Sequence, residues 1–249
     1  MKILFVHGVG HMDDNLWWQE VWVNAVEKAM GEGKKITPKF MSYDKLFEEN
    51  GPPSGWDYFK ALLSLLACRR EKSWHVRSHK PIGDKPLKNQ IRWRAGMVAE
   101  FLIDEDMKKK WRKQFNELLN DFQPDVVYAH SLGTLLTYDY LMHPDYKKEV
   151  HKWIYVTAAS QLYHDRLDHV FNRPLEMPLV KRWINLNNPH DMVLAENQLV
   201  VRMESSRTFE QHVVPWEATI LFNHDEPGYI IQTSIDTDVW ERMPMLVKM

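Results

Sequence analysis

Cysteine is almost absent from this chain, which has only Cys68 among its 249 residues. A single thiol cannot form an intrachain disulfide, and the cysteine-rich zinc modules need several thiolates. Long apolar runs are lacking as well. No stretch approaches the ~18 uninterrupted apolar residues of a membrane span, and the apolar run at residues 3–6 is too short for the core of a signal peptide. These absences predict a cytoplasmic protein with no stable insertion in a membrane.

An excess of charge of one sign is also lacking. The 32 Lys and Arg residues nearly balance the 34 Asp and Glu residues, which gives a formal net charge of −2. Proteins that coat nucleic acid or an anionic membrane depend on many unbalanced basic residues, so we expect no nucleic-acid partner. The segment 69–94 is a local exception, because it contains nine basic and only two acidic residues. It is either a solvated surface or a site for an anionic group.

The two ends of the sequence show a regular alternation of strand and helix patterns. Short apolar runs bounded by glycine, proline or polar residues predict strands, and apolar residues at helical spacing predict helices. The predicted strands are 2–6, 36–43, 125–129, 153–157, 183–186 and 209–214, and the predicted helices include 16–30, 132–142 and 228–235. This alternation is typical of an α/β fold with a mostly parallel sheet and helices on both faces. Ligands of such sheets bind beyond the carboxyl ends of the strands.

Residues 44–123 interrupt this alternation. They contain a predicted helix at 57–70, an irregular basic stretch, and a long helical pattern at 89–122. That pattern is broken at 104–110, where six of seven residues are charged. We therefore expect a single domain in which 44–123 is a largely helical cap inserted over the core.

The most informative stretch is Ala-His-Ser-Leu-Gly at residues 129–133, between a predicted strand and a predicted helix. A serine at such a sharp turn has a strained backbone, and its hydroxyl projects from the sheet. The residues two before and two after it must be small, as Ala129 and Gly133 are, because strand and helix approach closely there. With Ser131 at its centre, the turn resembles the nucleophile turn of the α/β-hydrolase superfamily, in particular its lipase- and esterase-like serine hydrolases. Glycine usually stands where this chain has Ala129, and the alternative role for Ser131 is that of a simple helix cap.

The resemblance implies that an acid and a histidine follow the serine in the chain, each after a strand. Asp191 follows the predicted strand 183–186 and matches the acid, and His224 precedes the last predicted helix and matches the histidine. In these roles His224 takes the proton of Ser131, and Asp191 orients the imidazole. The alternatives are Asp165 and Asp168 for the acid and His212 for the base.

The resemblance also implies two backbone N–H groups that stabilise the oxyanion formed during acyl transfer. One is the N–H of Leu132, the residue after the nucleophile. The other belongs to the loop after the first strand, where His-Gly-Val-Gly at residues 7–10 resembles the oxyanion loop of the superfamily. We assign Val9 as this second donor, with Gly10 as the alternative, and expect His7 to brace the loop.

These residues together predict a serine hydrolase that cleaves an ester or related acyl bond through an acyl-enzyme, without a cofactor. The expected substrate is a small-molecule or lipid-like acyl compound, selected by the cap. Two other classes stay open. One is a non-catalytic binding protein on the same fold, and the other is a metal-dependent hydrolase that uses His7, His11 and His190. The spacing of His7 and His11 suits a metal site on a helix, but the glycines at positions 8 and 10 disfavour a helix there.

Overall fold

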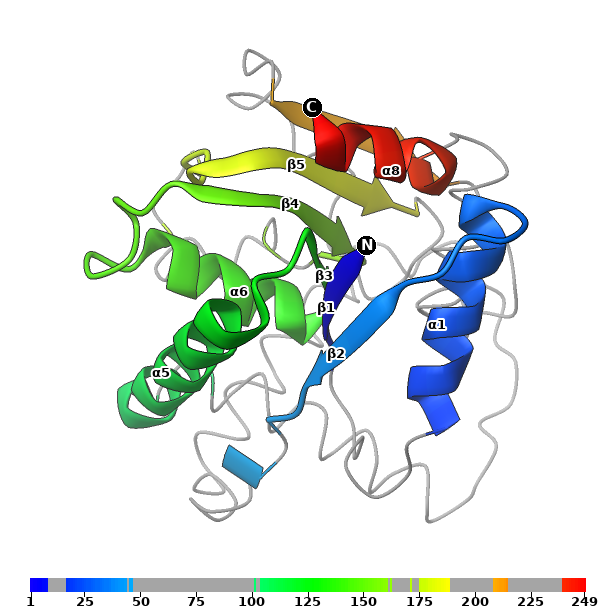
Figure 1. The fold of residues 1–249 in the computed structure, drawn as a ribbon. Coiled ribbons are helices and arrows are strands. Elements are labelled where there is room, and N and C mark those ends of the chain that lie inside the picture. Colours follow the sequence, from blue (N-terminus) through cyan, green and yellow to red (C-terminus); the bar gives the residue numbers. More distant parts are fainter. Residues whose placement is uncertain are drawn as a thin grey trace, which may run out of the picture.

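Six parallel strands form the centre of the computed structural model, which describes residues 1–8, 17–43, 45–46, 101, 104–160, 162, 171, 175–188, 208–214 and 239–249. The strands are β1 (Lys2–Val6), β2 (Thr37–Met41), β3 (Val126–His130), β4 (His151–Ala158), β5 (Val180–Asn187) and β6 (Phe209–Val213). Their order in the sheet is β2-β1-β3-β4-β5-β6, and every neighbouring pair is parallel. The predicted α/β class is therefore confirmed for the described part of the chain (Figure 1).

Each predicted strand corresponds to an observed strand, but β4 and β5 begin earlier than predicted. They start at His151 and Val180, which are paired with each other across the two strands. The added residues include the half-buried Lys181 and Arg182. Polar side chains at a strand end hide the apolar pattern, while the backbone pairing continues through them.

Two pairs of helices cover the two faces of the sheet (Figure 1). Helices α1 (Trp17–Met30) and α8 (Val239–Lys248) lie over one face, and α5 (Glu105–Phe122) and α6 (Leu132–Met142) lie over the other. Alternate residues of the central strands divide between the two cores. Phe5 and Tyr128 pack edge-on against Trp22 of α1, whereas Val6 and Ala129 belong to the core under α5 and α6.

Helix α5 is part of this main core, although it lies within the range 44–123. Its Trp111 and Phe115 are fully buried in the same cluster as residues of β1 and β3. Asp104 is the N-cap, and its carboxylate accepts a hydrogen bond from the Met107 N–H at 2.8 Å. The predicted break at 104–110 therefore coincides with the start of a helix only at Asp104, and the charged residues from Glu105 to Lys110 are helical. Of the predicted cap before Asp104, the structure describes only residues 45, 46 and 101.

Helix α8 has no counterpart among the predicted helices, and the predicted helix 228–235 lies outside the described residues. Pro244 lies inside α8, although proline lacks the N–H that continues a helix and its ring clashes with the preceding turn. The packing of one apolar side of α8 against the core outweighs this local cost. The buried residues on that side are Val239, Trp240, Met243 and Leu246.

A partly buried ionic network joins α5 to α6. Arg112 donates to Asp139 at 2.7 Å and to Glu105, which also pairs with Lys108 at 2.8 Å. Burial raises the pKa of Asp139, although the hydrogen bond from Arg112 opposes that rise. Burial alone would raise the pKa of Glu105 too, but hydrogen bonds from Lys108 and Arg112 lower it. The network fixes α6 against the longer helix beside it.

The first strand is held by residues far along the chain. The N–H of Lys2 donates to the carboxylate of Asp125 at 2.7 Å, and the N–H of Asp125 donates to the carbonyl of Lys2 at 2.9 Å. These bonds start the pairing of β1 with β3. The order in which the chain adds strands to the sheet reverses at β1. The next strand, β2, lies on one side of β1, and all later strands, β3 to β6, lie on the other side. In open parallel sheets the ligand site is beyond the carboxyl ends of the strands at such a switch point.

At the edge of the sheet formed by β6, Glu210 connects three elements. Its carboxylate accepts hydrogen bonds from Arg182 of β5, from His212 at 3.1 Å and from Arg242 of α8 at 3.1 Å. Burial alone would raise the pKa of Glu210, but the hydrogen bonds from His212 and Arg242 and the charge of Arg182 lower it.

We expect Glu210→Gln to lower the free energy of unfolding at neutral pH by about 1 kcal/mol. A carboxyl group whose pKa is lower in the folded than in the unfolded state contributes stability above the unfolded pKa, and loses it as the pH falls through the folded pKa. The difference between wild type and variant should therefore shrink as the pH falls below the ordinary value of 4.5. Urea unfolding across this pH range measures it, and the exposed Glu241 provides a control in Glu241→Gln. A difference in the free energy of unfolding between wild type and Glu210→Gln that grows as the pH falls would contradict the prediction.

Candidate active site

Ser131 occupies a sharp turn between β3 and α6. Its backbone φ is 51° and its ψ is −120°, a conformation that residues other than glycine rarely adopt. β3 ends at His130 and α6 begins at Leu132, so strand, turn and helix follow one another as predicted. A strained serine between a strand and a helix has the backbone geometry of a nucleophile turn.

The backbone of Ser131 is held by hydrogen bonds on both sides, whereas its hydroxyl makes none within the described part of the chain. Its N–H donates to Ala158 O at 3.0 Å, and its carbonyl accepts from the N–H and hydroxyl of Thr134 at 2.9 and 2.6 Å. Ser131 is 1% exposed, and among the described residues its Oγ has no hydrogen-bond partner. Buried hydroxyl groups normally have one. The Ser131 hydroxyl is therefore not committed to stabilising the described structure.

The end of β1 lies directly against this turn. A Cβ on Gly8 would be 2.9 Å from Ser131 Cβ and 2.9 Å from His130 Nδ1. A Cβ on Gly133 would be only 2.5 Å from the carbonyl oxygen of His7. Contacts this short leave no room for a side chain at either glycine. The backbone of His7 and Gly8 therefore packs as one unit with Ser131 and the first turn of α6.

Tyr43, two residues beyond β2, braces the end of β1. Its hydroxyl lies 2.5 Å from His7 O and 2.9 Å from Gly8 O, and its ring stacks on the His7 imidazole with centroids 4.1 Å apart. His7 Nδ1 lies 2.7 Å from Gly8 O, and because a carbonyl only accepts, Nδ1 must carry the proton and donate. This contact agrees with the bracing role expected for His7. Nothing in the sequence singled out Tyr43.

The ends of β4 and β5 carry buried polar side chains that sequence reasoning also missed. The hydroxyl of Thr157 donates to Asn185 Oδ1 at 2.7 Å and accepts from Trp183 Nε1 at 2.9 Å. Ser160, just after β4, donates to the hydroxyl of Thr134 in α6 at 3.1 Å. The available signal was threonine and asparagine inside otherwise apolar strands. These bonds connect the carboxyl ends of β4 and β5 to each other, and the segment after β4 to α6.

Of the predicted site residues, the structure brings Ser131 and Leu132 together at the turn, next to Gly8. The other predicted and alternative site residues lie outside the described residues. They are Val9, Gly10, His11, Asp165, Asp168, His190, Asp191 and His224.

The alternative base, His212, is described and lies far from Ser131. His212 lies in β6, where it pairs with Leu186 of β5. Since β6 is three strands from β3, a spacing of ~4.8 Å between strands puts His212 roughly 14 Å from the strand that precedes Ser131. Its Nε2 is hydrogen-bonded to Glu210 at 3.1 Å. The assignment of His212 as the base is therefore wrong, because an imidazole must be within hydrogen-bond reach of the hydroxyl it deprotonates.

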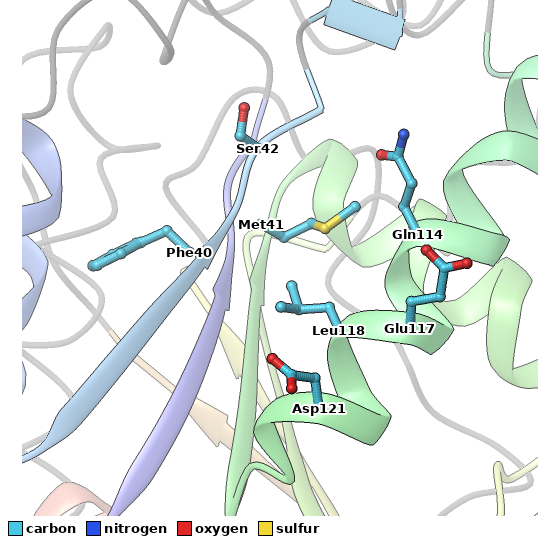
Figure 2. Close-up of a pocket in the computed structure, with 7 residues that line it drawn as sticks. All are labelled: Phe40, Met41, Ser42, Gln114, Glu117, Leu118 and Asp121. Atoms are coloured by element: carbon cyan, nitrogen blue, oxygen red, sulfur yellow. The ribbon is translucent and has the colours of Figure 1, made fainter.

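Figure 2 shows a separate groove between the end of β2 and helix α5, with a volume of about 420 Å³. Met41 of β2 and Leu118 of α5 supply its apolar lining, while the ring of Phe40, which also borders the groove, points away from it. Ser42, Gln114, Glu117 and Asp121 supply its polar lining. None of these residues was predicted to act in catalysis, and the groove does not include Ser131.

Two expectations concern groups outside the protein chain. In the ranges that the structure describes, no helix has both the length and the apolar character needed to cross a membrane. Within the same ranges, no three His, Cys, Asp or Glu side chains gather as a metal site would require. Of the three histidines in the metal-dependent alternative, only His7 is described.

Comparisons with known proteins add little to this geometry. No protein-family model and no curated protein matches the chain. A solved structure of an azoreductase from Bacillus anthracis str. Sterne aligns over 100% of both chains with 12% identity and a TM-score of 0.29. A TM-score this low carries no argument about fold or function. The interpretation of the site therefore depends on the residues of this chain.

Proposed function

We propose that this protein is a serine hydrolase of the α/β-hydrolase fold that cleaves a carboxylic ester or a related acyl bond. The observation that carries the proposal is the backbone of Ser131, which has a positive φ at the carboxyl end of β3 and lies against Gly8 at the switch point of the sheet. A serine that only caps a helix has an extended backbone and a side-chain bond to the helix. Ser131 has neither, which favours a nucleophile.

In the proposed reaction the Ser131 oxygen attacks the acyl carbon while its proton passes to His224, which Asp191 orients. The N–H groups of Leu132 and Val9 stabilise the oxyanion of the tetrahedral intermediate. The alcohol leaves with a proton from His224, and the acyl group stays on Ser131. Water then attacks this acyl-enzyme and gives a proton to His224, which returns it to the Ser131 oxygen as the bond to the acyl group breaks and the acid is released.

The first turn of α6 supports the role of Leu132. The first N–H groups of a helix have no partner within the helix, and they lie at the positive end of its dipole. Leu132 is the first residue of α6 and follows the nucleophile directly. Its N–H is therefore suited to an oxygen that gains negative charge beside Ser131.

The proposed substrate is a small-molecule or lipid-like acyl compound, and the reaction needs no cofactor. The near-zero net charge favours such a substrate over nucleic acid. We also propose a cytoplasmic location, which the single cysteine supports.

A fluorophosphonate probe tests the proposal directly. We expect the probe to label the wild-type protein on Ser131 and to leave Ser131→Ala unlabelled. Ser42→Ala is the matched control, because Ser42 lines the separate groove, and it should be labelled like the wild type. A folded wild-type protein that never reacts would favour the binding-protein alternative. Hydrolysis that is lost with a chelator and unchanged in Ser131→Ala would select the metal-dependent one.

A further inference from the structure

We infer that Tyr43 is a positioning residue for the oxyanion hole, acting through the peptide bond that follows Gly8. The inference rests on the proposed function and deepens it. It begins with the Tyr43 hydroxyl, whose single proton is shared between two consecutive carbonyl oxygens, those of His7 and Gly8. No family pattern in the sequence includes this tyrosine.

The carbonyl of Gly8 is held by His7 Nδ1 and by part of a three-centre bond from Tyr43. His7 Nδ1 donates to it at 2.7 Å. The single proton of the Tyr43 hydroxyl lies between His7 O at 2.5 Å and Gly8 O at 2.9 Å, so it is shared by the two oxygens. A trans peptide is planar, and its N–H points opposite to its carbonyl. Fixing the Gly8 carbonyl therefore fixes the direction of the next N–H in the chain, which is the proposed second donor of the oxyanion hole.

The fixed peptide belongs to the same packed unit as the nucleophile. Gly8 lies so close to Ser131 and His130 that no Cβ would fit. The other carbonyl held by Tyr43, that of His7, is the one that leaves no room for a Cβ on Gly133 of α6. Tyr43 thus holds the backbone that faces both sides of the Ser131 turn.

Burial makes the shared hydrogen bond of this hydroxyl hard to replace. Tyr43 is 1% exposed, and His7 is fully buried, so water has little access to the carbonyls, and an unpaired polar group is costly in such surroundings. The ring and the hydroxyl also have separable roles. The ring packs on the His7 imidazole, while only the hydroxyl reaches the carbonyls. Tyr43→Phe therefore keeps the packing and removes only the shared hydrogen bond, which leaves His7 Nδ1 as the donor to Gly8 O.

We expect Tyr43→Phe to lower kcat for ester hydrolysis on the order of 10-fold, less than the ~10²–10³-fold that follows complete loss of an oxyanion donor. KM should change by less than about twofold, because the oxyanion forms only on the way to the transition state. Inhibition by a boronic acid, which forms a tetrahedral anion on the serine, should weaken by a factor similar to the loss in kcat. A purely structural role would not produce this selective loss in kcat and boronate affinity.

Tyr140→Phe is the matched control. Tyr140 is also buried, and its hydroxyl donates to Asn116 at 2.8 Å between α6 and α5. This variant should lose a similar amount of thermal stability and keep the wild-type kcat. An unchanged kcat in Tyr43→Phe, or an equal loss in both variants, would overturn the inference alone. A wild-type protein without Ser131-dependent hydrolysis would overturn the proposed function as well.

A second variant covers the case in which Tyr43→Phe does not fold. His7→Phe keeps an aromatic ring against Tyr43 but removes the Nδ1 donor to Gly8 O. The same selective loss in kcat is expected, and a kcat equal to that of the wild type would overturn the inference.

Discussion

Replacing Ser131 by alanine is expected to lower kcat for the hydrolysis of p-nitrophenyl esters by on the order of 10⁶-fold. Without the hydroxyl no acyl-enzyme can form, and only the oxyanion donors and substrate binding still accelerate attack by water. A panel of p-nitrophenyl esters with increasing acyl length measures the loss for each substrate. The same panel run on the wild type reveals the preferred acyl length.

The stability of two variants at this position provides the control. Alanine must adopt the same φ of 51° as serine, so Ser131→Ala should unfold at nearly the wild-type temperature. Ser131→Gly should be as inactive but more stable than Ser131→Ala, because glycine adopts positive φ without steric cost. Activity of Ser131→Ala within tenfold of the wild type would show that this oxygen is not the nucleophile.

Replacing Gly133 by alanine is expected to destabilise the protein by roughly 2 kcal/mol, the typical cost of overpacking. Helix propensity alone predicts the opposite sign, since alanine in a helix is favoured over glycine by about 1 kcal/mol. The new Cβ would be 2.5 Å from His7 O and 2.7 Å from Val6 O. Both atoms belong to the backbone of the central strand β1 and the residue after it, which cannot move without disturbing the sheet. Urea unfolding measures the change in stability, and kcat should fall because the Ser131 turn is displaced.

Gly33→Ala separates crowding from the backbone freedom of glycine. Gly33 has a φ of 73° but nothing within 4 Å of an added Cβ, so alanine there meets only the local backbone strain of a positive φ, at a cost of about 1 kcal/mol. This variant should keep full activity. If Gly133→Ala were as stable and active as the wild type, the close approach of α6 to β1 would be wrong.

Most of the sheet was predictable because its strands are local apolar runs. The run at residues 2–6 and that at 125–129 each coincide with a buried strand to within one residue. The end of helix α5 at Phe122 was predicted, but its start was not, because the charged residues among 105–110 that predicted a break are helical. Helix α8 was missed because Pro244 normally ends a helix, and here tertiary packing overrides that local preference.

In the candidate site, too, the features formed by neighbouring residues were predictable and those formed by residues far apart in the chain were not. The Ser131 turn was predictable because strand, small residues, serine and helix follow one another within a few positions. Tyr43 was not, since it meets the His7 carbonyl 36 positions earlier in the chain, and its own neighbours give no sign of that contact. Asp191, His224 and Val9 stay predictions that rest on the family resemblance.

The pairing of β1 with β3 has a consequence for how the chain acquires its fold in the cell. The hydrogen bond between Lys2 and Asp125 joins residues 123 positions apart. The strand β3, which pairs with β1 on the side facing the centre of the sheet, begins only after Asp125. At typical translation rates β1 leaves the ribosome on the order of 10 s before that partner exists. During this interval an apolar strand edge is exposed to other chains. Long-range parallel pairing of this kind has high contact order and folds slowly, so holdase chaperones that cover nascent apolar segments should raise the yield of folded protein.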